Sequence, residues 1–250
     1  MGRAFAFLLI LLGAQLAAST FKICAFNIRS FGKAKAANRK VMGALVQILS
    51  RCDISAVQEV RDAKGSAIRI LLQELNRYDP SHHYSCLESK RLGRGSYKEQ
   101  NVFVYRMDVV SVTDWCQFGE EDSGPFEAFA RGPFAARFHS PNTGVTQFPT
   151  TTGTREIALP EPPVSISLGD RGSVGKEAVI RDFMPLSHPI RVPRIIVHGD
   201  ELLGAVVARS AKPFNFTHAL GLSEEEALEI SDHYPVEVNL KLAPKAQREL

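Results

Sequence analysis

The stretch that decides the fold lies early in the chain, at Phe21–Ile28, and it reads FKICAFNI. A short run of mostly apolar residues is typical of a buried strand. The next segment, Ala37–Ser50, has apolar residues at helical spacing, and Ile54–Val60 has strand character again. The alternation of strand and helix around Phe21–Ile28 predicts a layered architecture.

The segments further along the chain extend this pattern. Apolar residues at helical spacing between Ile68 and Leu75 predict a second helix. A capping box that starts at Ser223 predicts a short helix, and the alternating segment Val236–Leu242 predicts a half-buried strand after it. Three further strand-like runs are Asn101–Tyr105, Val109–Cys116 and Phe134–His139. The sequence therefore predicts a layered α/β or α+β domain without internal repeats.

The overall composition is that of an ordinary globular protein. The 250 residues are 44% hydrophobic and 23% charged, with a formal net charge of +3, which excludes disordered and collagen-like chains. This weakly basic balance permits an acidic partner such as nucleic acid but does not argue for one. The four cysteines are too few and too scattered for a disulfide scaffold. We expect Cys24 and Cys52 to be buried thiols, although disulfides become possible if the chain is secreted.

The N-terminus, residues 1–19, has the pattern of a secretory signal peptide. A basic residue precedes the apolar run Ala4–Leu12, which is too short to span a bilayer, and small residues suited to cleavage precede Thr20. We therefore expect a secreted mature chain that begins near Thr20, with an uncleaved anchor as the alternative. Secretion makes Asn215, in an Asn-Phe-Thr triplet, a candidate N-glycosylation site.

A proline-rich stretch interrupts the periodic pattern. Seven of the 14 prolines lie between Pro149 and Pro193. Because proline lacks the backbone donor that helices and sheets require, little regular structure is expected there. We interpret this stretch as an irregular insert or as a replacement for other residues.

Acidic and polar residues lie where the expected strands end. Asn27 closes the first strand, Glu59 lies at the end of the second, and Glu99 follows a basic loop. Asp232 and His233 precede the last strand. Carboxylates and an amide at one edge of a sheet are suitable ligands for Mg²⁺, Mn²⁺ or Ca²⁺, and a histidine beside a carboxylate can act as a general base.

Each of these features has a purely structural alternative. A lone glutamate at a strand end is most often solvated, and an Asp-His pair after a helix commonly forms a turn. The basic residues Arg91, Arg94 and Lys98 commonly belong to a solvated loop. By spacing alone, none of these motifs is specific.

Several segments, however, resemble the DNase I family. Besides the opening strand, they are RCDI at Arg51–Ile54, QEV at Gln58–Val60, LGRGSYKE at Leu92–Glu99, FVYR at Phe103–Arg106, RGPF at Arg131–Phe134 and ISDHYPVEV at Ile230–Val238. The motifs follow the family's order and gaps. The resemblance covers about Phe21 to Phe148 and Arg194 to Leu242, and it looks closest to the DNase γ-like branch.

This resemblance implies an α/β fold: a four-layer sandwich of two packed mixed sheets flanked by helices. It also implies endonucleolytic hydrolysis of DNA phosphodiester bonds with Mg²⁺ and Ca²⁺, or Mn²⁺. By resemblance, Glu59, Asn27 and Asp232 lie on the metal side, Glu99 orients a general-acid histidine, and His233 activates water. The positions that match DNA-backbone contacts are Arg61, Arg94, Tyr97 and Arg131. Backbone contacts give salt-dependent binding with little sequence preference.

The middle of the chain departs from the family pattern. The histidine that protonates the leaving oxygen, the Gly-Asp-Phe-Asn-Ala strand end and the Tyr-Asp-Arg motif all lack counterparts. Only Leu168–Arg171 imitates the start of the second motif, and Pro193-Arg194 stands where Asp-Arg is expected. Loss of a general acid typically costs about 10²- to 10⁴-fold in rate. The sequence therefore predicts an impaired secreted endonuclease with an incomplete central part; the alternative is an inactive variant or mispredicted isoform that at most binds DNA or a protein partner.

The expected organisation has five parts. They are the signal peptide at 1–19, the N-terminal half of the domain at 20–148, the proline-rich segment at 149–193, the C-terminal part at 194–242 and a tail at 243–250. The expected partner is DNA, and the chain is expected to be a monomer without a membrane span. Actin binding, known for some family members, has no support in the sequence. The expected location is extracellular, with the endoplasmic reticulum or nuclear envelope as alternatives.

Overall fold

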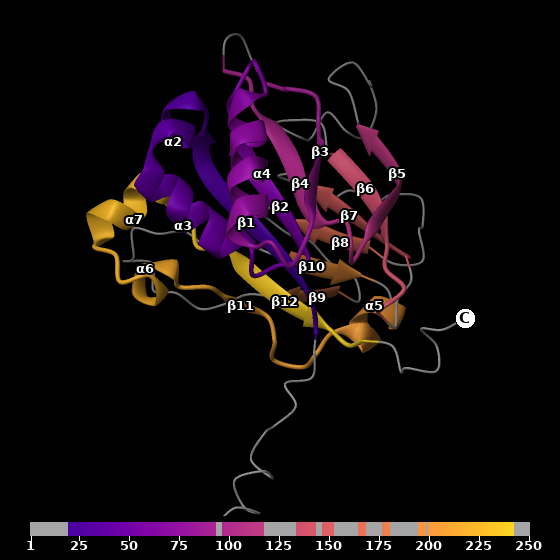
Figure 1. Ribbon diagram of the computed structural model, residues 1–250. Helices are drawn as coiled ribbons and strands as arrows, with labels where there is room; N and C mark the ends of the chain where they lie inside the picture. Colours follow the sequence, from indigo (N-terminus) through magenta and orange to yellow (C-terminus); the bar gives the residue numbers. More distant parts are fainter. Residues whose placement is uncertain are drawn as a thin grey trace, which may run out of the picture.

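The computed structural model describes residues 20–93, 97–117, 134–143, 147–152, 165–168, 177–180, 195–198 and 200–242. Two six-stranded sheets pack face to face (Figure 1). The strand order is β11-β12-β1-β2-β4-β3 in the first sheet and β5-β6-β7-β8-β10-β9 in the second. The expected signal peptide lies outside the described residues. None of the helices in the described part of the chain has the length and apolar character needed to cross a membrane.

The first sheet is built around the opening strand. Its strands are β1 (Phe21–Phe31), β2 (Ile54–Val60), β3 (Tyr84–Glu88), β4 (Gln100–Arg106), β11 (Lys212–Pro213) and β12 (Val236–Leu240). β1 pairs in parallel with β2 and antiparallel with β12. Segments from both ends of the chain therefore meet in the middle of the first sheet. The strands predicted in these segments are confirmed.

The second sheet comes from the middle of the chain. Its strands are β5 (Ser111–Gln117), β6 (Phe134–His139), β7 (Gln147–Thr152), β8 (Ser165–Leu168), β9 (Glu177–Ile180) and β10 (Ile195–His198). β7 and β8 are parallel, and the other neighbouring pairs are antiparallel.

The expectation of little regular structure between residues 149 and 193 is wrong for the residues of β7, β8 and β9. β8 and β9 fall between the prolines and contain none. Pro149 lies within β7, but the pairing of β7 with β8 starts only at Thr150, so the missing donor falls beyond the end of that ladder.

Five of the described helices cover the outer face of the first sheet. They are α2 (Lys33–Ala37), α3 (Arg39–Leu49), α4 (Ser66–Tyr78), α6 (Phe216–Ala219) and α7 (Glu224–Ile230), and each contributes residues to the core on that face. The helix expected at 37–50 is present as α3, and it starts at Arg39 because Asn38 caps it through its side-chain oxygen. The capping box predicted at Ser223 is also confirmed, with Glu226 as its second member.

Two cores lie on opposite faces of the first sheet. Ile23 and Ala25 of β1 belong to the core between the sheets, whereas Phe26 and Ile28 belong to the core under the helices. Both faces of β1 are therefore buried, which explains why its sequence is almost continuously apolar. The remaining helix, α5 (Asp200–Ala205), contributes to the core between the sheets. The mixed sheets with flanking helices confirm the predicted fold class.

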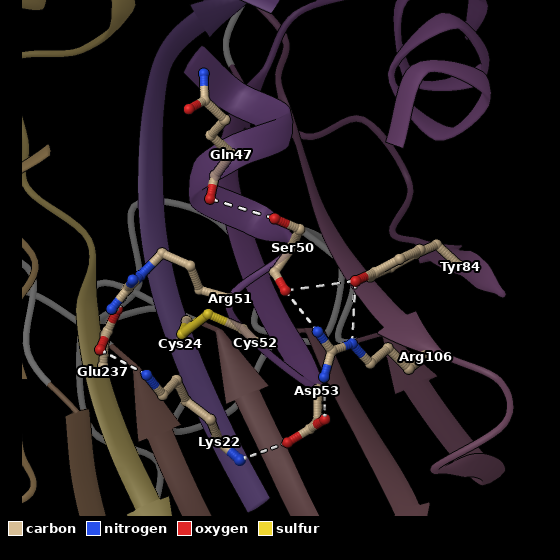
Figure 2. The surroundings of a disulfide bond; sticks show 10 residues. All are labelled: Lys22, Cys24, Gln47, Ser50, Arg51, Cys52, Asp53, Tyr84, Arg106 and Glu237. Carbon is tan, nitrogen blue, oxygen red and sulfur yellow. Dashed lines mark hydrogen bonds and ion pairs between the residues drawn. A yellow bond between two sulfur atoms is a disulfide. The ribbon is translucent and has the colours of Figure 1, made fainter. Parts of the chain in front are cut away.

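A disulfide joins β1 to the turn before β2. Figure 2 shows Cys24 and Cys52 bonded to each other. Their Cα atoms are 6.0 Å apart. The expectation of buried thiols is therefore wrong for this pair, because parallel pairing of β1 and β2 brings both residues within bonding distance. Cys86 and Cys116 are free thiols.

Candidate active site

The end of β1 departs from regular strand geometry. Between Asn27 and Phe31 its register against β2 shifts, and Arg29 and Ser30 adopt positive φ angles of 43° and 53°. Positive φ is costly for residues with a side chain, and such strain concentrates at functional sites. Here it directs the N–H of Arg29 to Asn27 Oδ1 at 2.9 Å and the N–H of Ser30 to Glu59 Oε2 at 3.1 Å.

Glu59 lies opposite this bulge, on the neighbouring strand. Its φ is 60°, and the pairing of β2 with β4 shifts register between Val57 and Val60. Asn27 Nδ2 donates to Glu59 Oε1 at 2.8 Å. The paired irregularities of β1 and β2 therefore bring two of the predicted metal-side residues into direct contact.

Asp232 and His233 reach the same edge from the turn between α7 and β12. His233 Nδ1 lies 3.0 Å from Asp232 Oδ1, and the imidazole is buried. Ser231, which the sequence analysis did not single out, donates its hydroxyl to the Asn27 carbonyl at 2.5 Å and accepts from the His233 N–H at 2.9 Å. The Ser231 hydroxyl thus attaches the Asp-His turn directly to the end of β1.

The ionisation of Asp232 is set by its surroundings. Burial pushes the pKa of its carboxyl upward, but the His233 charge and hydrogen bond outweigh burial and hold the pKa below its ordinary value. Asp232 is therefore an anion at neutral pH, available both to orient the imidazole and to bind a cation.

Lys35, on α2, is a second residue that the sequence analysis missed. Its ammonium donates to the carbonyls of Ile28 and Arg29 and, on the other side, to that of Ile230. Burial, followed by the charge of Arg29, lowers the pKa of Lys35 to about 8, against the opposing effects of Asp232 and Glu59. One lysine in the short segment KAKAA carries no local signal of its contact with Ile230, which lies 195 residues away.

Arg61 and Tyr97 form a stacked pair beside the bulge. The Arg61 guanidinium lies 3.7 Å from the centre of the Tyr97 ring, in cation–π geometry, and its Nη1 is 3.3 Å from Ser30 Oγ. The Tyr97 side chain is about half exposed. Two of the four predicted DNA-backbone residues are therefore together, whereas Arg94 and Arg131 lie outside the described residues.

Glu99 lies at the same edge of the sheet, immediately before β4. The residue after it, Gln100, pairs with Val60 of β2, so Glu99 is one strand away from Glu59. Its side chain is buried. Backbone hydrogen bonds with Leu92 close the loop before it. The structure thus brings Asn27, Glu59, Glu99, Asp232 and His233 to one edge of the first sheet.

The candidate metal ligands fit a hard divalent cation by their chemistry. Within the described ranges no group of three or more acidic, histidine or cysteine side chains is arranged to hold a metal ion. Mg²⁺, however, is commonly bound through one or two carboxylates together with water and substrate phosphate. Glu59 accepts one hydrogen bond on each oxygen, which leaves further lone pairs for a cation.

Asn215, the candidate glycosylation site, lies immediately before α6. It is exposed and caps α6, accepting from the His218 N–H at 3.0 Å through its side-chain oxygen. The side-chain nitrogen is not used in this cap.

Comparison with known proteins defines the class. Residues 24–213 match the Endonuclease/Exonuclease/phosphatase family. Among solved structures, a humanized D. rerio TDP2 superposes with a TM-score of 0.56 at 12% identity, covering 90% of this chain and 99% of that chain. The human Nocturnin catalytic domain gives 0.55 at 13%, covering 90% and 95%. At these identities the likeness establishes the fold alone, and the family match makes the chain a member of this phosphoesterase class.

Closer relatives narrow the class. The chain is 38% identical to Deoxyribonuclease-1 of Canis lupus familiaris, over 94% of this chain and 97% of the relative. It is 37% identical to Deoxyribonuclease-1-like 1 of Sus scrofa, over 95% and 86%, and 34% identical to human Deoxyribonuclease gamma, over 96% and 92%. The chain therefore belongs to the DNase I family. These similar identities do not single out the DNase γ-like branch.

The alignments also show a difference in length. The match to canine Deoxyribonuclease-1 extends over 278 positions, although this chain has only 250 residues. The relative therefore carries residues within the matched span that have no counterpart here.

Proposed function

We propose that this chain is a secreted, divalent-cation-dependent DNA endonuclease of greatly reduced activity. The observation that carries the proposal is the direct linkage at one sheet edge of Asn27, Glu59 and the Ser231–His233 turn. These residues supply a cation and phosphate site and a general base. The general acid has no counterpart in the sequence.

His233 is suited to activate water. If its Nδ1 carries the proton and donates to Asp232, its Nε2 is an acceptor that can take a proton from a water molecule. Asp232 then stabilises the imidazolium that results. Glu59, Asn27 and Asp232 would hold Mg²⁺ or Ca²⁺, or Mn²⁺, which when bound supplies neutralisation of the phosphate charge.

The stacked pair of Arg61 and Tyr97, beside this edge, would bind the substrate. The Arg61 guanidinium is suited to a phosphate oxygen, and the half-exposed Tyr97 ring offers a face for sugar or base. Such contacts recognise the backbone and not the sequence. We therefore propose duplex DNA as the substrate, with little sequence preference.

The reduced activity follows from the missing motifs. Without a positioned general acid, the leaving oxygen must take its proton from solvent, at a cost of about 10²- to 10⁴-fold in rate. The difference in length supports this interpretation, because canine Deoxyribonuclease-1 has residues within the matched span that this chain lacks.

Plasmid nicking tests the proposal. The mature chain with Mg²⁺ and Ca²⁺ is expected to nick supercoiled plasmid slowly, and His233→Ala is expected to lower that rate by about 10²-fold or more. His218→Ala is the matched control, because His218 is an exposed histidine on α6. Equal nicking by the wild type and His233→Ala would contradict a role for His233.

The alternative function is DNA binding without cleavage. One observation favours it: Arg61 and Tyr97 are stacked in place and do not depend on the missing general acid. Fluorescence anisotropy with labelled duplex in EDTA measures this binding. Arg61→Ala is expected to weaken it and to reduce the salt slope by about 1. DNA binding without any nicking of plasmid in the presence of Mg²⁺ and Ca²⁺ would favour this alternative.

Secretion and glycosylation belong to the same proposal. Residues 1–19 would direct export, and the exposed Asn215 would accept the glycan. Expression in mammalian cells tests both, since export with a mass loss on deglycosylation that Asn215→Gln abolishes is the expected result. A monomeric state stays a prediction, and actin binding stays without support.

A further inference from the structure

Lys35 binds two distant segments with one ammonium group. The ammonium uses all three of its N–H donors. Its nitrogen lies 3.0 Å from the carbonyl oxygen of Ile28, 2.6 Å from that of Arg29 and 2.8 Å from that of Ile230. The first two carbonyls belong to the end of β1, and Ile230 is the last residue of α7. Every acceptor is a backbone oxygen, so the interaction fixes the path of the chain.

The position of these carbonyls relates Lys35 to the site. Ile28 directly follows Asn27, and Ile230 precedes the Ser231–His233 turn. Arg29 holds a positive φ of 43°, and the hydrogen bond from Lys35 to its carbonyl helps to offset that strain. The ammonium therefore joins the segment that carries Asn27 to the segment that carries Asp232 and His233.

We propose that Lys35 is a positioning residue that sets the separation between the Asn27–Glu59 contact and the Asp232–His233 turn, and so the affinity of this edge for a divalent cation. The proposal rests on the proposed function. Lys35 does not touch substrate; it acts through the backbone of both segments. Three carbonyls that converge from two sides suit a tetrahedral ammonium better than a planar guanidinium, so arginine is a poor replacement.

A second tie limits the expected effect. The Ser231 hydroxyl also bonds the Asn27 carbonyl, in parallel with Lys35. Loss of Lys35 is therefore expected to loosen the edge and not to separate the two segments. Removing partners that orient metal ligands typically costs about 10- to 100-fold in metal affinity or activity, and we expect the lower end of that range.

The test compares Lys35→Met with Lys33→Met. Lys33 is an exposed lysine on the same short helix, so both variants lose one charge and keep the aliphatic stem. Mn²⁺ binding without DNA, measured by electron paramagnetic resonance, is expected to weaken about tenfold in Lys35→Met and less than twofold in Lys33→Met. In nicking assays kcat should fall about tenfold with KM within twofold. Lys35→Arg should recover thermal stability more than Mn²⁺ affinity.

The opposite results overturn the proposal. If Lys35→Met matches Lys33→Met in Mn²⁺ affinity and kcat while only its melting temperature falls, Lys35 is purely structural. If the wild type does not nick DNA, the proposed hydrolytic function is wrong. The comparison of Mn²⁺ affinity between Lys35→Met and Lys33→Met then still tests the positioning role of Lys35.

If the wild type binds no Mn²⁺ either, the part of the proposal that concerns cation affinity is overturned, and hydrogen exchange decides whether Lys35 positions the two segments. Faster exchange confined to peptides 26–31 and 228–234 in Lys35→Met supports the positioning role, and exchange equal to that of Lys33→Met overturns it. Should Lys35→Met fail to fold, Lys35→Arg takes its place in each comparison.

Discussion

The two sheets of this protein carry different shares of the predicted site. Asn27, Glu59, Glu99, Asp232 and His233 all lie on or beside strands of the first sheet, at one edge. The described strands of the second sheet, which come from the middle of the chain, carry none of the predicted site residues. The family motifs that the chain lacks belong to that same middle part. The predicted site residues that the structure describes therefore depend on the first sheet for their placement.

The two sheets also differ in how they are covered. The first sheet is buried on both faces, by the helices and by the second sheet. The second sheet ends in the edge strand β5, where most residues are exposed, Trp115 and Cys116 among them. An exposed edge strand is a common site of unwanted pairing between chains. β5 is thus more exposed than β3, an edge strand of the sheet that carries the predicted site.

The largest effect is expected from Phe103→Ala, which tests how firmly the sheets are joined. Phe103 is fully buried between them, with ring centres 5.4 Å from Phe134 and 5.5 Å from Phe138 of β6. Its loss leaves a cavity and is expected to cost about 3–5 kcal/mol of unfolding free energy, measured by urea denaturation.

Phe26→Ala provides the control on the opposite face of the first sheet. Phe26 is equally buried and packs on Phe216 of α6 at 6.0 Å. A similar loss is expected there. If Phe103→Ala costs less than half as much as Phe26→Ala, the second sheet contributes little to stability and the two halves are not one cooperative unit.

The next largest effect concerns the Cys24–Cys52 disulfide, which belongs to the first sheet alone. The bond closes a loop of 28 residues in sequence, and replacing both cysteines by alanine is expected to cost about 2–4 kcal/mol. The free thiol Cys86 supplies the control, since Cys86→Ala should cost less than about 1 kcal/mol. Equal losses of unfolding free energy in the Cys24→Ala/Cys52→Ala variant and in Cys86→Ala would show that the disulfide does not stabilise the sheet that carries the site.

The smallest of the three effects is the acid sensitivity caused by Glu237. This buried carboxylate on β12 accepts from Lys22 at 2.9 Å and from Arg51 at 2.7 Å, as Figure 2 shows. Burial raises its pKa, but hydrogen bonds from Arg51 and Lys22 outweigh burial and hold the pKa below the ordinary 4.5. A carboxyl with a lowered pKa contributes stability that is present above pH 4.5 and lost as the pH falls through the folded-state pKa.

Glu237→Gln is therefore expected to cost about 1 kcal/mol at pH 7 and to flatten the loss of stability below pH 4.5. Glu225→Gln, at an exposed position on α7, should leave the pH profile unchanged. An unchanged profile for Glu237→Gln, recorded by thermal melts between pH 3 and 7, would exclude Glu237 as the source of acid sensitivity.

The regular part of the first sheet could be predicted from sequence, whereas its irregular edge could not. Nearly continuous apolar runs predicted β1 and β2 because both faces of the sheet are buried, and helical spacing of apolar residues predicted α3. The positive φ angles fall on Arg29, Ser30 and Glu59, none of which is a glycine, so no turn residue announced the bulge. β8 and β9 were missed because the flanking prolines hid two four-residue strands.

The site residues themselves were located by resemblance and not by spacing. Lys35 and Ser231 were missed because their partners, Ile230 and Asn27, lie 195 and 204 residues away in sequence. Contacts of a side chain with a distant backbone leave no local pattern. The pairing of β1 with β12 brings these segments together.

The edge strand β5 also carries a built-in optical probe. Trp115 is the single tryptophan of the chain, and it is about half exposed, with its ring 6.2 Å from that of Phe134. Its emission therefore reports on the surroundings of β5 and β6. Intrinsic fluorescence can follow the behaviour of the second sheet in the unmodified protein, while far-ultraviolet circular dichroism, dominated by the helices, follows the layer over the first.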